Sequence, residues 1–505
     1  MKTILIPLLF LSFMAAGQQQ PNIVVIISDD HTMQAIGSYG ATYGLTPNID
    51  RLAAEGALFT RAFVTNSICA PSRAVLVTGK LSHKNGHINN LTEFDGSQDQ
   101  YQKQLQRAGY ETAWIGKWHL GSDPQGFDYW EILPGQGHYY NPDFINMDGS
   151  KSRVEGYCTN IITDKATKWL DGRDKTKPFS LVVGHKATHR TWMPDTTDLG
   201  ATENLAIPLP ESFYDRYTGR VAAQDQDLSI EKTMLMGYDL KMFDDSLAAL
   251  EEPGIRRMNP GQRRKYLDYY RRNKMSMDSA YLAGNALTVW KYTHYMQDYL
   301  ATAISLDRNV GRLINYLKEN NLLDNTLIVY TSDQGFYLGE HGWFDKRFMY
   351  EESMRTPLII RYPPMIRKGI RLNNLVMNLD LAPTFLDLAE VPVPPDMQGK
   401  SLLPLFSPTA RNPWRSGVYY HYYEFPGEHH VYRHFGIRND RFKLIRFYGP
   451  KDFWELYDLE KDPHELMNLA QDEQYHGQLT TLKQELLRLI LQYEDKEALA
   501  IFNNN

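Results

Sequence analysis

Cysteine is nearly absent from this chain of 505 residues. Only Cys69 and Cys158 occur, which excludes the multiple-disulfide frameworks that hold small secreted domains together. A single disulfide between these two residues stays open. An excess of charge of one sign is also absent. The formal net charge is −6, so nothing in the composition indicates a nucleic-acid partner.

Long apolar runs are absent beyond the first residues. Lys2 is followed by an apolar run over 4–14, by small residues at 15–17 and by glutamines at 18–20. This layout is typical of a cleavable secretory signal, and the run is too short to span a bilayer. We therefore expect a signal peptide over residues 1–19, no transmembrane segment, and an exported protein that is periplasmic or secreted.

Two kinds of apolar segment alternate along the rest of the chain. The composition, 42% hydrophobic and 23% charged, is that of a globular protein with a sizeable core. Short apolar runs predict buried strands, and stretches of helical period predict helices between them. This alternation predicts an α/β fold with a mostly parallel central sheet flanked by helices. The predicted strands are Ile23–Ile27, Thr112–Ile115, Ser180–Val183, Thr326–Tyr330 and Pro357–Ile360, and the helices are Gln98–Arg107, Tyr299–Lys318 and Leu381–Ala389.

The pattern changes after Val391, where three prolines follow within four residues. We expect a large domain over residues 20–395 and a smaller C-terminal α+β subdomain with an antiparallel sheet over 396–505. The polar segment from about 203 to 276 fits neither pattern and is interpreted as a surface insertion with helices. The elements predicted in the subdomain are strands Gly417–Tyr423 and Phe442–Tyr448 and a helix over Leu479–Tyr493.

Two predicted strands end in acidic clusters. The first runs into Asp29-Asp30 and the second into Asp333-Gln334. Ligands of open α/β sheets collect at the carboxyl ends of the strands, so we expect these residues to meet. Three carboxylates so close to one another repel each other unless a cation lies between them. Oxygen donors suit calcium or magnesium. Either pair alone could simply cap a turn, but the two together favour the metal.

Cys69 comes just before a predicted helix. Pro71 suits the first turn of that helix, so Cys69 should lie at its N-terminus, where the backbone N–H groups favour an anion. A thiol in such a place is expected to be reactive. A disulfide to Cys158 remains the alternative.

Cys69-Ala70-Pro71-Ser72-Arg73 is followed by Leu76-Val77-Thr78-Gly79, and Gly116-Lys117-Trp118-His119 forms a second motif further along the chain. These motifs resemble those of the formylglycine-dependent sulfatases, which belong to the alkaline phosphatase-like superfamily. In that family the motif cysteine is oxidised to formylglycine by a formylglycine-generating enzyme. Thr188 replaces a proline of the family, and Gln334 replaces the commoner asparagine but keeps an amide oxygen. The resemblance covers nearly all of the mature chain. The matching segments are Cys69–Arg73 with Leu76–Gly79, Asp29-Asp30, Thr46–Leu52, Gly116–His119, Lys186–His189, Asp333-Gln334, Lys346 and Glu455–Leu459.

The resemblance implies a cation and a nucleophile. Formylglycine at residue 69, as its hydrate, would attack sulfur, and Arg73 would hold it. The cation would be Ca²⁺, with Mg²⁺ as an alternative. Its implied ligands are Asp29, Asp30, Cys69, Asp333 and Gln334.

The resemblance also implies roles for four further residues. Lys117 and Lys346 would bind the sulfate oxygens. His189 would protonate the departing alcohol, and His119 would accept a proton from the second hydroxyl of the hydrate as sulfate leaves. Taken singly, each of these residues could instead have a purely structural role. A lone lysine is usually a solvated charge, and a lone histidine is usually a structural hydrogen-bonding group.

The substrate is less well specified by the sequence. The segments Gly126–Trp130, Gly135–Asn141 and Asp345–Glu351 resemble N-acetylglucosamine-6-sulfatases. This likeness implies a sulfated carbohydrate substrate, namely 6-O-sulfated N-acetylglucosamine of heparan-type glycosaminoglycans or mucins. Another sulfated sugar or an aryl sulfate stays open. The segment 421–424 with His429, His430 and Arg438 could contact a sugar or could form an ordinary surface loop.

Two other classes of function stay open. A phosphodiesterase or phosphonate hydrolase of the same superfamily would cleave phosphorus esters. However, two-metal phosphatases add histidine ligands, and Gln334 offers an amide at that point. A non-catalytic glycan-binding protein would leave Cys69 unconverted.

Overall fold

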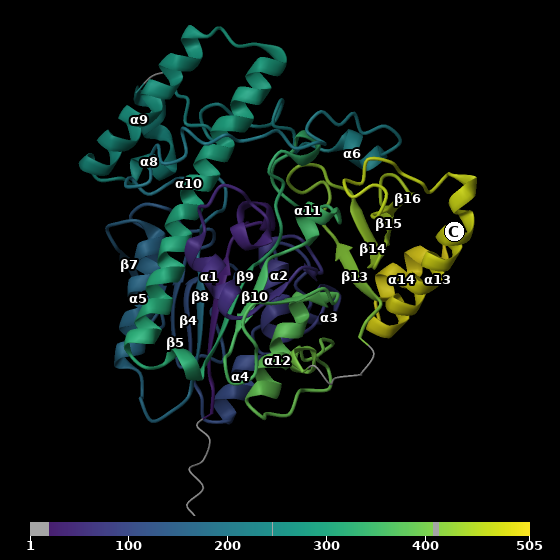
Figure 1. Ribbon diagram of the computed structural model, residues 1–505, viewed down its shortest axis with the longest axis horizontal. Coiled ribbons are helices and arrows are strands. Elements are labelled where there is room, and N and C mark those ends of the chain that lie inside the picture. The colour runs from purple at the N-terminus through teal and green to yellow at the C-terminus, as the bar shows by residue number, and fades with distance from the viewer. Residues whose placement is uncertain (1–19, 245, 408–413, 505) are drawn as a thin grey trace, which may run out of the picture.

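A ten-stranded sheet forms the centre of the large domain in the computed structural model, which describes residues 20–244, 246–407 and 414–504 (Figure 1). The signal peptide expected over 1–19 lies outside the described residues. The strand order is β11-β2-β10-β9-β1-β8-β4-β5-β6-β7, and the block from β9 to β5 is parallel. The mostly parallel α/β fold predicted from the sequence is therefore confirmed. The strands are β1 (Asn22–Ser28), β2 (Ala57–Phe59), β4 (Glu111–Lys117), β5 (Tyr129–Leu133), β6 (Asp143–Asn146), β7 (Lys151–Arg153), β8 (Phe179–Gly184), β9 (Thr326–Ser332), β10 (Leu358–Arg361) and β11 (Ile370–Leu372).

Helices cover both faces of this sheet. The predicted helices at 98–107 and 381–389 are present within one to three residues of the expected ends. The helix predicted to begin at Tyr299 begins at Gly284 instead, because its first turns pack against the insertion rather than against the sheet. None of the helices in the described part of the chain has the length and apolarity that crossing a bilayer requires. The principal helices are α1 (Pro47–Glu55), α2 (Cys69–Thr78), α4 (Tyr101–Arg107), α5 (Cys158–Gly172), α10 (Gly284–Glu319) and α12 (Leu381–Leu388).

The segment interpreted as an insertion contains four helices joined by irregular chain. Its longest helix, α9, begins with a capping box in which Asn259 and Gln262 bond each other's backbone. Tyr266 and Tyr270 of α9 pack among the aromatic residues of α10. Figure 1 shows α9 and the first turns of α10 at one end of the molecule. The helices are α6 (Val221–Asp225), α7 (Ser246–Glu251), α8 (Pro253–Arg256) and α9 (Pro260–Ser279).

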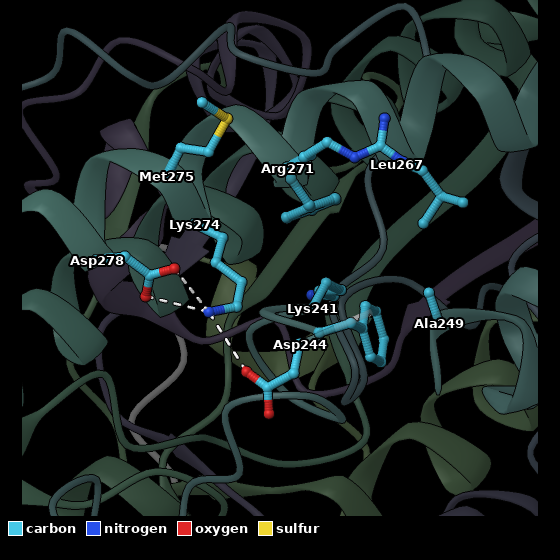
Figure 2. A pocket seen from close by; sticks show the side chains of 10 residues that line it. Lys241, Asp244, Ala249, Leu267, Arg271, Lys274, Met275 and Asp278 are labelled. Atoms are coloured by element: carbon cyan, nitrogen blue, oxygen red, sulfur yellow. Dashed lines mark hydrogen bonds and ion pairs between the residues drawn. The ribbon is translucent and has the colours of Figure 1, made fainter. Parts of the chain in front are cut away.

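A cavity of about 320 Å³ lies within the insertion, between α9 and the segment around Lys241. Figure 2 shows Lys274 placed between Asp244 and Asp278 on its wall. Lys241 in turn contacts Asp298, at 2.8 Å. These lysines already have carboxylate partners, so the cavity offers little unbalanced charge to a ligand.

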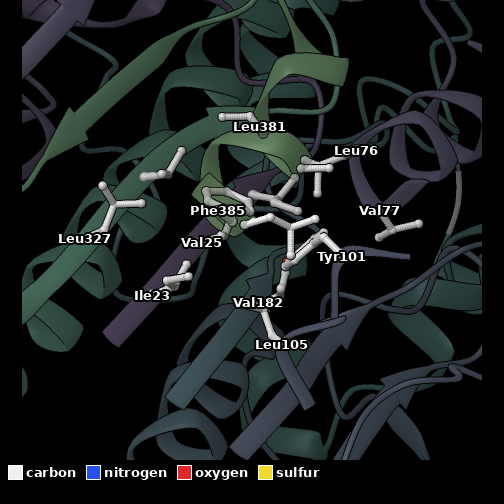
Figure 3. Close-up of a cluster of buried hydrophobic side chains, with 14 of the residues drawn as sticks. Ile23, Val25, Leu76, Val77, Tyr101, Leu105, Val182, Leu327, Leu381 and Phe385 are labelled. Carbon is white, nitrogen blue, oxygen red and sulfur yellow. The ribbon is translucent and has the colours of Figure 1, made fainter. Parts of the chain in front are cut away.

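The side chains of β1 show why the sheet needs helices on both faces. Ile23 and Val25 point into one apolar cluster, and Val24 and Ile26 point into another. Figure 3 shows the first cluster, where Phe385 of α12 packs against the strands together with residues of α2 and α4. Residues of α1, α5 and α10 fill the second cluster. A strand that is apolar on both faces must be buried on both, as the sequence predicted.

The C-terminal part of the chain forms a separate four-stranded antiparallel sheet. Two of its strands, β13 and β15, and the final long helix were predicted. The family resemblance of Glu455–Leu459 implied a strand where β16 lies. β14 was not predicted, because its alternating polar residues give a weaker signal than a continuous apolar run. The proposed boundary at residue 395 stays a prediction. The elements are β13 (Gly417–Tyr422), β14 (Arg433–Asn439), β15 (Phe442–Tyr448), β16 (Phe453–Asp458), α13 (His476–Tyr493) and α14 (Lys496–Asn503).

A buried lysine links this sheet to the large domain. Lys443 is fully buried, and its Nζ lies 3.0 Å from Glu351 Oε1 and 2.7 Å from Glu465 Oε1. Glu351 belongs to the short helix α11 (Glu351–Met354) that precedes β10. Lys443 is therefore a cation that two buried carboxylates share, and Arg438 is a second partner of Glu351.

Replacing Lys443 with methionine should therefore destabilise the protein strongly. The two carboxylates would lose their shared cation, a change that costs about 3–5 kcal/mol in buried pairs. Urea unfolding followed by circular dichroism measures the loss. The matched control is Lys451→Met, since Lys451 is an exposed member of the pair with Asp225. An unchanged midpoint in Lys443→Met would contradict the importance of this contact.

Candidate active site

The two acidic clusters meet at the carboxyl ends of neighbouring strands. β1 and β9 pair in parallel with Ser28 opposite Ser332. This register brings the residues that follow the two strands to one edge of the sheet. The backbone N–H of Asp30 donates to Asp333 Oδ1 at 3.2 Å, and Gln334 Nε2 donates to Asp30 Oδ1. All of these side chains are buried.

Helix α2 brings Cys69 and Arg73 to the same place. Cys69 is the first residue of the helix, and its Sγ lies 3.4 Å from Asp29 Oδ1. Arg73, one turn further along, contacts Asp333 Oδ2 through Nε at 3.0 Å and Nη2 at 2.9 Å. The sulfur and the guanidinium therefore contact different aspartates of the same carboxylate cluster.

The structure corrects one expectation about the thiol. Cys69 and Cys158 are both free and buried, so the disulfide alternative is wrong for this structure. The expected reactivity of the thiol stays a prediction. Burial raises the pKa of Cys69 and the Asp29 carboxylate raises it further, whereas Lys117 and Lys346 lower it.

Lys117 and His119 lie at and just after the end of strand β4. Lys117 is the last residue of β4, and its Nζ donates to Asp29 Oδ2. The preceding Gly116 has φ +101, and a Cβ there would lie 2.1 Å from the carbonyl oxygen of Gly184. Only glycine allows this close approach of β4 to β8. His119 follows with Nδ1 buried and without a hydrogen-bond partner in the described structure.

The remaining histidine and lysine reach the cluster from two loops. His189 Nδ1 lies 2.6 Å from the carbonyl oxygen of Arg190, which can only accept, so Nδ1 carries a proton. His189 Nε2 is the free nitrogen, and it lies 4.0 Å from Asp30 Oδ2. Lys346 Nζ donates to the same oxygen at 2.8 Å. The structure thus brings every predicted site residue into one cluster.

The donor set fits a divalent cation. One oxygen each of Asp29, Asp30 and Asp333 and the Cys69 sulfur lie within 4.8 Å of one another. Gln334 Oε1 is buried beside them without a hydrogen-bond partner among the described residues. Burial raises the pKa of Asp333 to about 7, and the neighbouring Asp29 carboxylate adds to the effect. Clustered carboxylates and an unsatisfied amide oxygen are what a hard cation requires.

Sequence reasoning gave no role to three neighbours of the site. Gln136 Oε1 accepts from Lys117 Nζ at 2.5 Å, and the Gln136 carbonyl accepts from Lys186 Nζ at 3.1 Å. The Tyr139 hydroxyl donates to the carbonyl of His189 at 2.6 Å. All three residues lie in segments already noted for their resemblance, but a motif does not reveal which neighbours touch.

Two of the residues suggested as sugar contacts are engaged elsewhere. His421 contacts Asp495 and Tyr448 within the C-terminal subdomain. Arg438 contacts Glu351, 3.2 Å away. His429 does lie near the site, since its Nε2 is 3.6 Å from Asp345 Oδ2, next to Lys346.

Comparison with known proteins agrees with this geometry. Residues 21–391 match the sulfatase family, and residues 339–492 match the family described as N-sulphoglucosamine sulphohydrolase, C-terminal. The N-acetylglucosamine-6-O-sulfatase of Bacteroides thetaiotaomicron is 48% identical over 513 residues, covering 98% of this chain and 92% of that protein. The human N-acetylglucosamine-6-sulfatase is 27% identical over 443 residues, covering 81% and 68%.

Solved structures give the same result. One, of a protein in complex with its substrate D-glucosamine-2-N,6-O-disulfate, has a TM-score of 0.92 and 48% identity and covers 95% of this chain and 99% of that chain. A phosphonate monoester hydrolase of Agrobacterium radiobacter has a TM-score of 0.69 at 20% identity over 94% and 96%, and shares the fold alone. The family match spans most of the chain and includes every residue of the cluster. The chain therefore belongs to the sulfatase family.

Proposed function

We propose that this chain hydrolyses the 6-O-sulfate ester of glucosamine units in sulfated glycans, with N-acetylglucosamine-6-sulfate as the reference substrate. One observation supports the reaction class. Cys69 Sγ lies 3.4 Å from Asp29 Oδ1, and the aspartates of this cluster are contacted by Arg73, Lys117 and Lys346. The likeness to an N-acetylglucosamine-6-O-sulfatase over 98% of the chain supports the choice of sugar. Export of the mature chain and its conversion by a formylglycine-generating enzyme are parts of this proposal.

The sulfatase family typically uses formylglycine and a metal, and the site fits both. Asp29, Asp30, Asp333 and Gln334 would hold the cation, with residue 69 beside it, and we propose Ca²⁺, with Mg²⁺ as the alternative. When present, formylglycine and the cation would supply the nucleophilic oxygen and withdraw negative charge from the sulfate.

The positively charged side chains of Arg73, Lys117 and Lys346 bind and orient the sulfate. Arg73 is fixed by two contacts to Asp333 and by donation from Nη1 to the carbonyl of Lys117 at 2.8 Å. Lys346 holds Asp30 through one ammonium proton. Lys117 holds Asp29 and Gln136 through two, so each lysine keeps at least one proton for a sulfate oxygen. These donors are in place before substrate arrives, so they stabilise the charge that develops as the S–O bond breaks.

The two histidines move protons. His189 Nδ1–H is held by the carbonyl of Arg190, so Nε2 delivers a proton to the sugar oxygen from the doubly protonated ring. Burial lowers the pKa of His189, which disfavours that form, whereas the nearby Asp29 carboxylate favours it. An alkoxide is a poor leaving group, so this proton matters most for sugar substrates. His119 has a buried Nδ1 without a partner in the described structure, and burial holds its pKa well below the ordinary value. His119 is therefore neutral and has a nitrogen lone pair that could accept a proton.

The test of the reaction class is release of inorganic sulfate from N-acetylglucosamine-6-sulfate. The protein is coexpressed with a formylglycine-generating enzyme and supplied with calcium. The matched substrate is N-acetylglucosamine-6-phosphate, which has the same sugar and the same ester position but a phosphorus centre and, near neutral pH, up to one more negative charge. Faster hydrolysis of the sulfate supports the proposal. Faster hydrolysis of the phosphate would contradict the proposal and indicate a phosphatase instead.

Calcium should also stabilise the folded protein. A cation that binds only the native state stabilises it by about 2.7 kcal/mol at a hundredfold excess over Kd. We expect thermal unfolding to shift upward with calcium and back with a chelator. Gln334→Leu, which removes one oxygen ligand, should shrink the shift. Equal midpoints with and without calcium would argue against a metal at this cluster.

A further inference from the structure

The loop after β8, which carries His189, is held by the insertion. His189 and Arg190 line a cavity of about 180 Å³ together with His138 and with insertion residues such as Tyr238. The His189 ring is oriented by the carbonyl of Arg190, which accepts the hydrogen bond from Nδ1 at 2.6 Å. The position of the ring therefore depends on where the backbone of Arg190 lies.

The side chain of Arg190 is fixed by one buried carboxylate. Asp239 is fully buried, and its two oxygens accept from Arg190 Nε at 2.6 Å and from Nη2 at 2.9 Å. Such a two-point contact fixes the direction of the guanidinium as well as its distance. Arg190 Cζ also lies 5.3 Å from the centre of the Tyr238 ring and 5.0 Å from that of Phe344. The Arg190 side chain is thus tied to the insertion.

Asp239 is itself held in place within the insertion. Its Oδ2 also accepts from the backbone N–H of Leu235 at 2.8 Å, and its own N–H donates to the Leu235 carbonyl at 3.0 Å. Two residues further on, Lys241 Nζ donates to the carbonyl oxygens of Thr191 and Trp192, at 2.5 and 3.1 Å. The insertion therefore contacts three consecutive residues directly after the histidine.

We propose that Asp239 is a positioning residue for His189, because its pair with the Arg190 guanidinium holds the Arg190 carbonyl where it fixes the histidine ring. Asp239 touches no reacting atom and acts only through Arg190. Under the proposed function, on which this inference rests, His189 protonates the sugar oxygen as it leaves. An error of about 1 Å in the placement of a catalytic group can cost about 10²-fold in rate. Loosening the pair should therefore slow the step that needs the proton.

The alternative is an ion pair that only joins the insertion to the large domain. A matched pair of that kind is formed by Asp198, which accepts from Arg308 at 2.8 and 2.7 Å. Asp198 is also buried, but its arginine partner belongs to α10 and not to the residues beside His189. Asp198→Asn is therefore the control for loosening a buried, two-point contact with arginine.

The experiment measures kcat for N-acetylglucosamine-6-sulfate and for 4-nitrophenyl sulfate on the converted, calcium-loaded enzyme. Asp239→Asn should lower the rate on the sugar ester by about 10²-fold and leave the aryl ester, whose phenolate needs no proton, nearly unchanged. Asp198→Asn should leave the ratio of the two rates unaltered. In a His189→Ala background, Asp239→Asn should cause no further loss on the sugar ester, since the group that it positions is gone.

Turnover of the aryl ester also shows whether Asp239→Asn folds. If it does not fold, Arg190→Gln combined with Asp239→Asn removes both charges, leaves neither one buried without a partner, and is put through the same comparison. Equal losses on both esters, or an additional loss in the His189→Ala background, would mean that the pair is only structural. Either result would overturn the inference.

A measurement without turnover separates this inference from the proposed function. Nitrogen NMR of isotopically labelled histidine reports which ring nitrogen carries the proton, and His189→Ala identifies the signal. The inference predicts Nδ1–H in the parent protein and a mixture of the two tautomers in Asp239→Asn. If neither ester is hydrolysed but this change is seen, the proposed function fails and the positioning role stands. An unchanged tautomer in Asp239→Asn would overturn the positioning role.

Discussion

Replacing His189 with alanine should slow sulfate release from N-acetylglucosamine-6-sulfate by about 10²–10⁴-fold, the usual contribution of a general acid. The same change should have little effect on an aryl sulfate whose phenol is acidic. A phenolate leaves without a proton, whereas a sugar alkoxide does not. The structure supports this role because Nδ1 is fixed by the carbonyl of Arg190 and Nε2 faces the cluster.

The measurement is kcat for the sugar sulfate and for 4-nitrophenyl sulfate, on the same preparations. The matched control is His138→Gln, which changes another ring of the same cavity and should leave the ratio of the two rates unaltered. A similar loss on both substrates in His189→Ala would show that this histidine positions sulfate rather than protonating the leaving group.

Cys69→Ala should abolish turnover and leave the fold intact. Alanine cannot be oxidised to the aldehyde, so the nucleophile is lost altogether. The cost to stability should be small, because the side chain loses one sulfur atom whose contacts are weak ones at 3.4 Å to Asp29 and Gln334. Sulfate release, circular dichroism and thermal unfolding check the two halves of this prediction.

Cys158→Ala is the natural control for this experiment. Cys158 is the other cysteine of the chain, is also buried and free, and as the first residue of α5 packs in an apolar cluster. Its loss should leave sulfate release largely intact. Retained turnover in Cys69→Ala would refute the formylglycine mechanism. Mass spectrometry of the peptide containing residue 69 would show whether conversion had taken place in the parent protein.

The parts of the fold predicted from the sequence were those with a strong local signal. β1 and β9 are continuous apolar runs ending in acids, so both the strands and their convergence could be predicted. The start of α10 could not, since its first turns are buried by the aromatic residues of the insertion and not by the sheet. A helix that packs against different elements along its length has no single apolar face, so its start cannot be predicted from the periodicity of its apolar residues.

The site was predictable for a different reason. Its residues lie in specific motifs, and the strand register then places them together. The contacts between motifs were not predictable. The raised pKa of the Cys69 thiol depends on burial and on Asp29, forty residues away in the chain. The contact of Arg190 with Asp239, 49 residues further along the chain, was not predictable either.

The most direct test of the whole account is the position of the sulfate that is removed. Converted, calcium-loaded protein is given N-acetylglucosamine-6-sulfate and its 3-sulfated isomer in parallel, and free sulfate is measured over time. The account predicts release from the 6-sulfate and not from the 3-sulfate, because the choice of the 6-position rests on the likeness to an N-acetylglucosamine-6-O-sulfatase over 98% of the chain. Release from the 3-sulfate alone would contradict it.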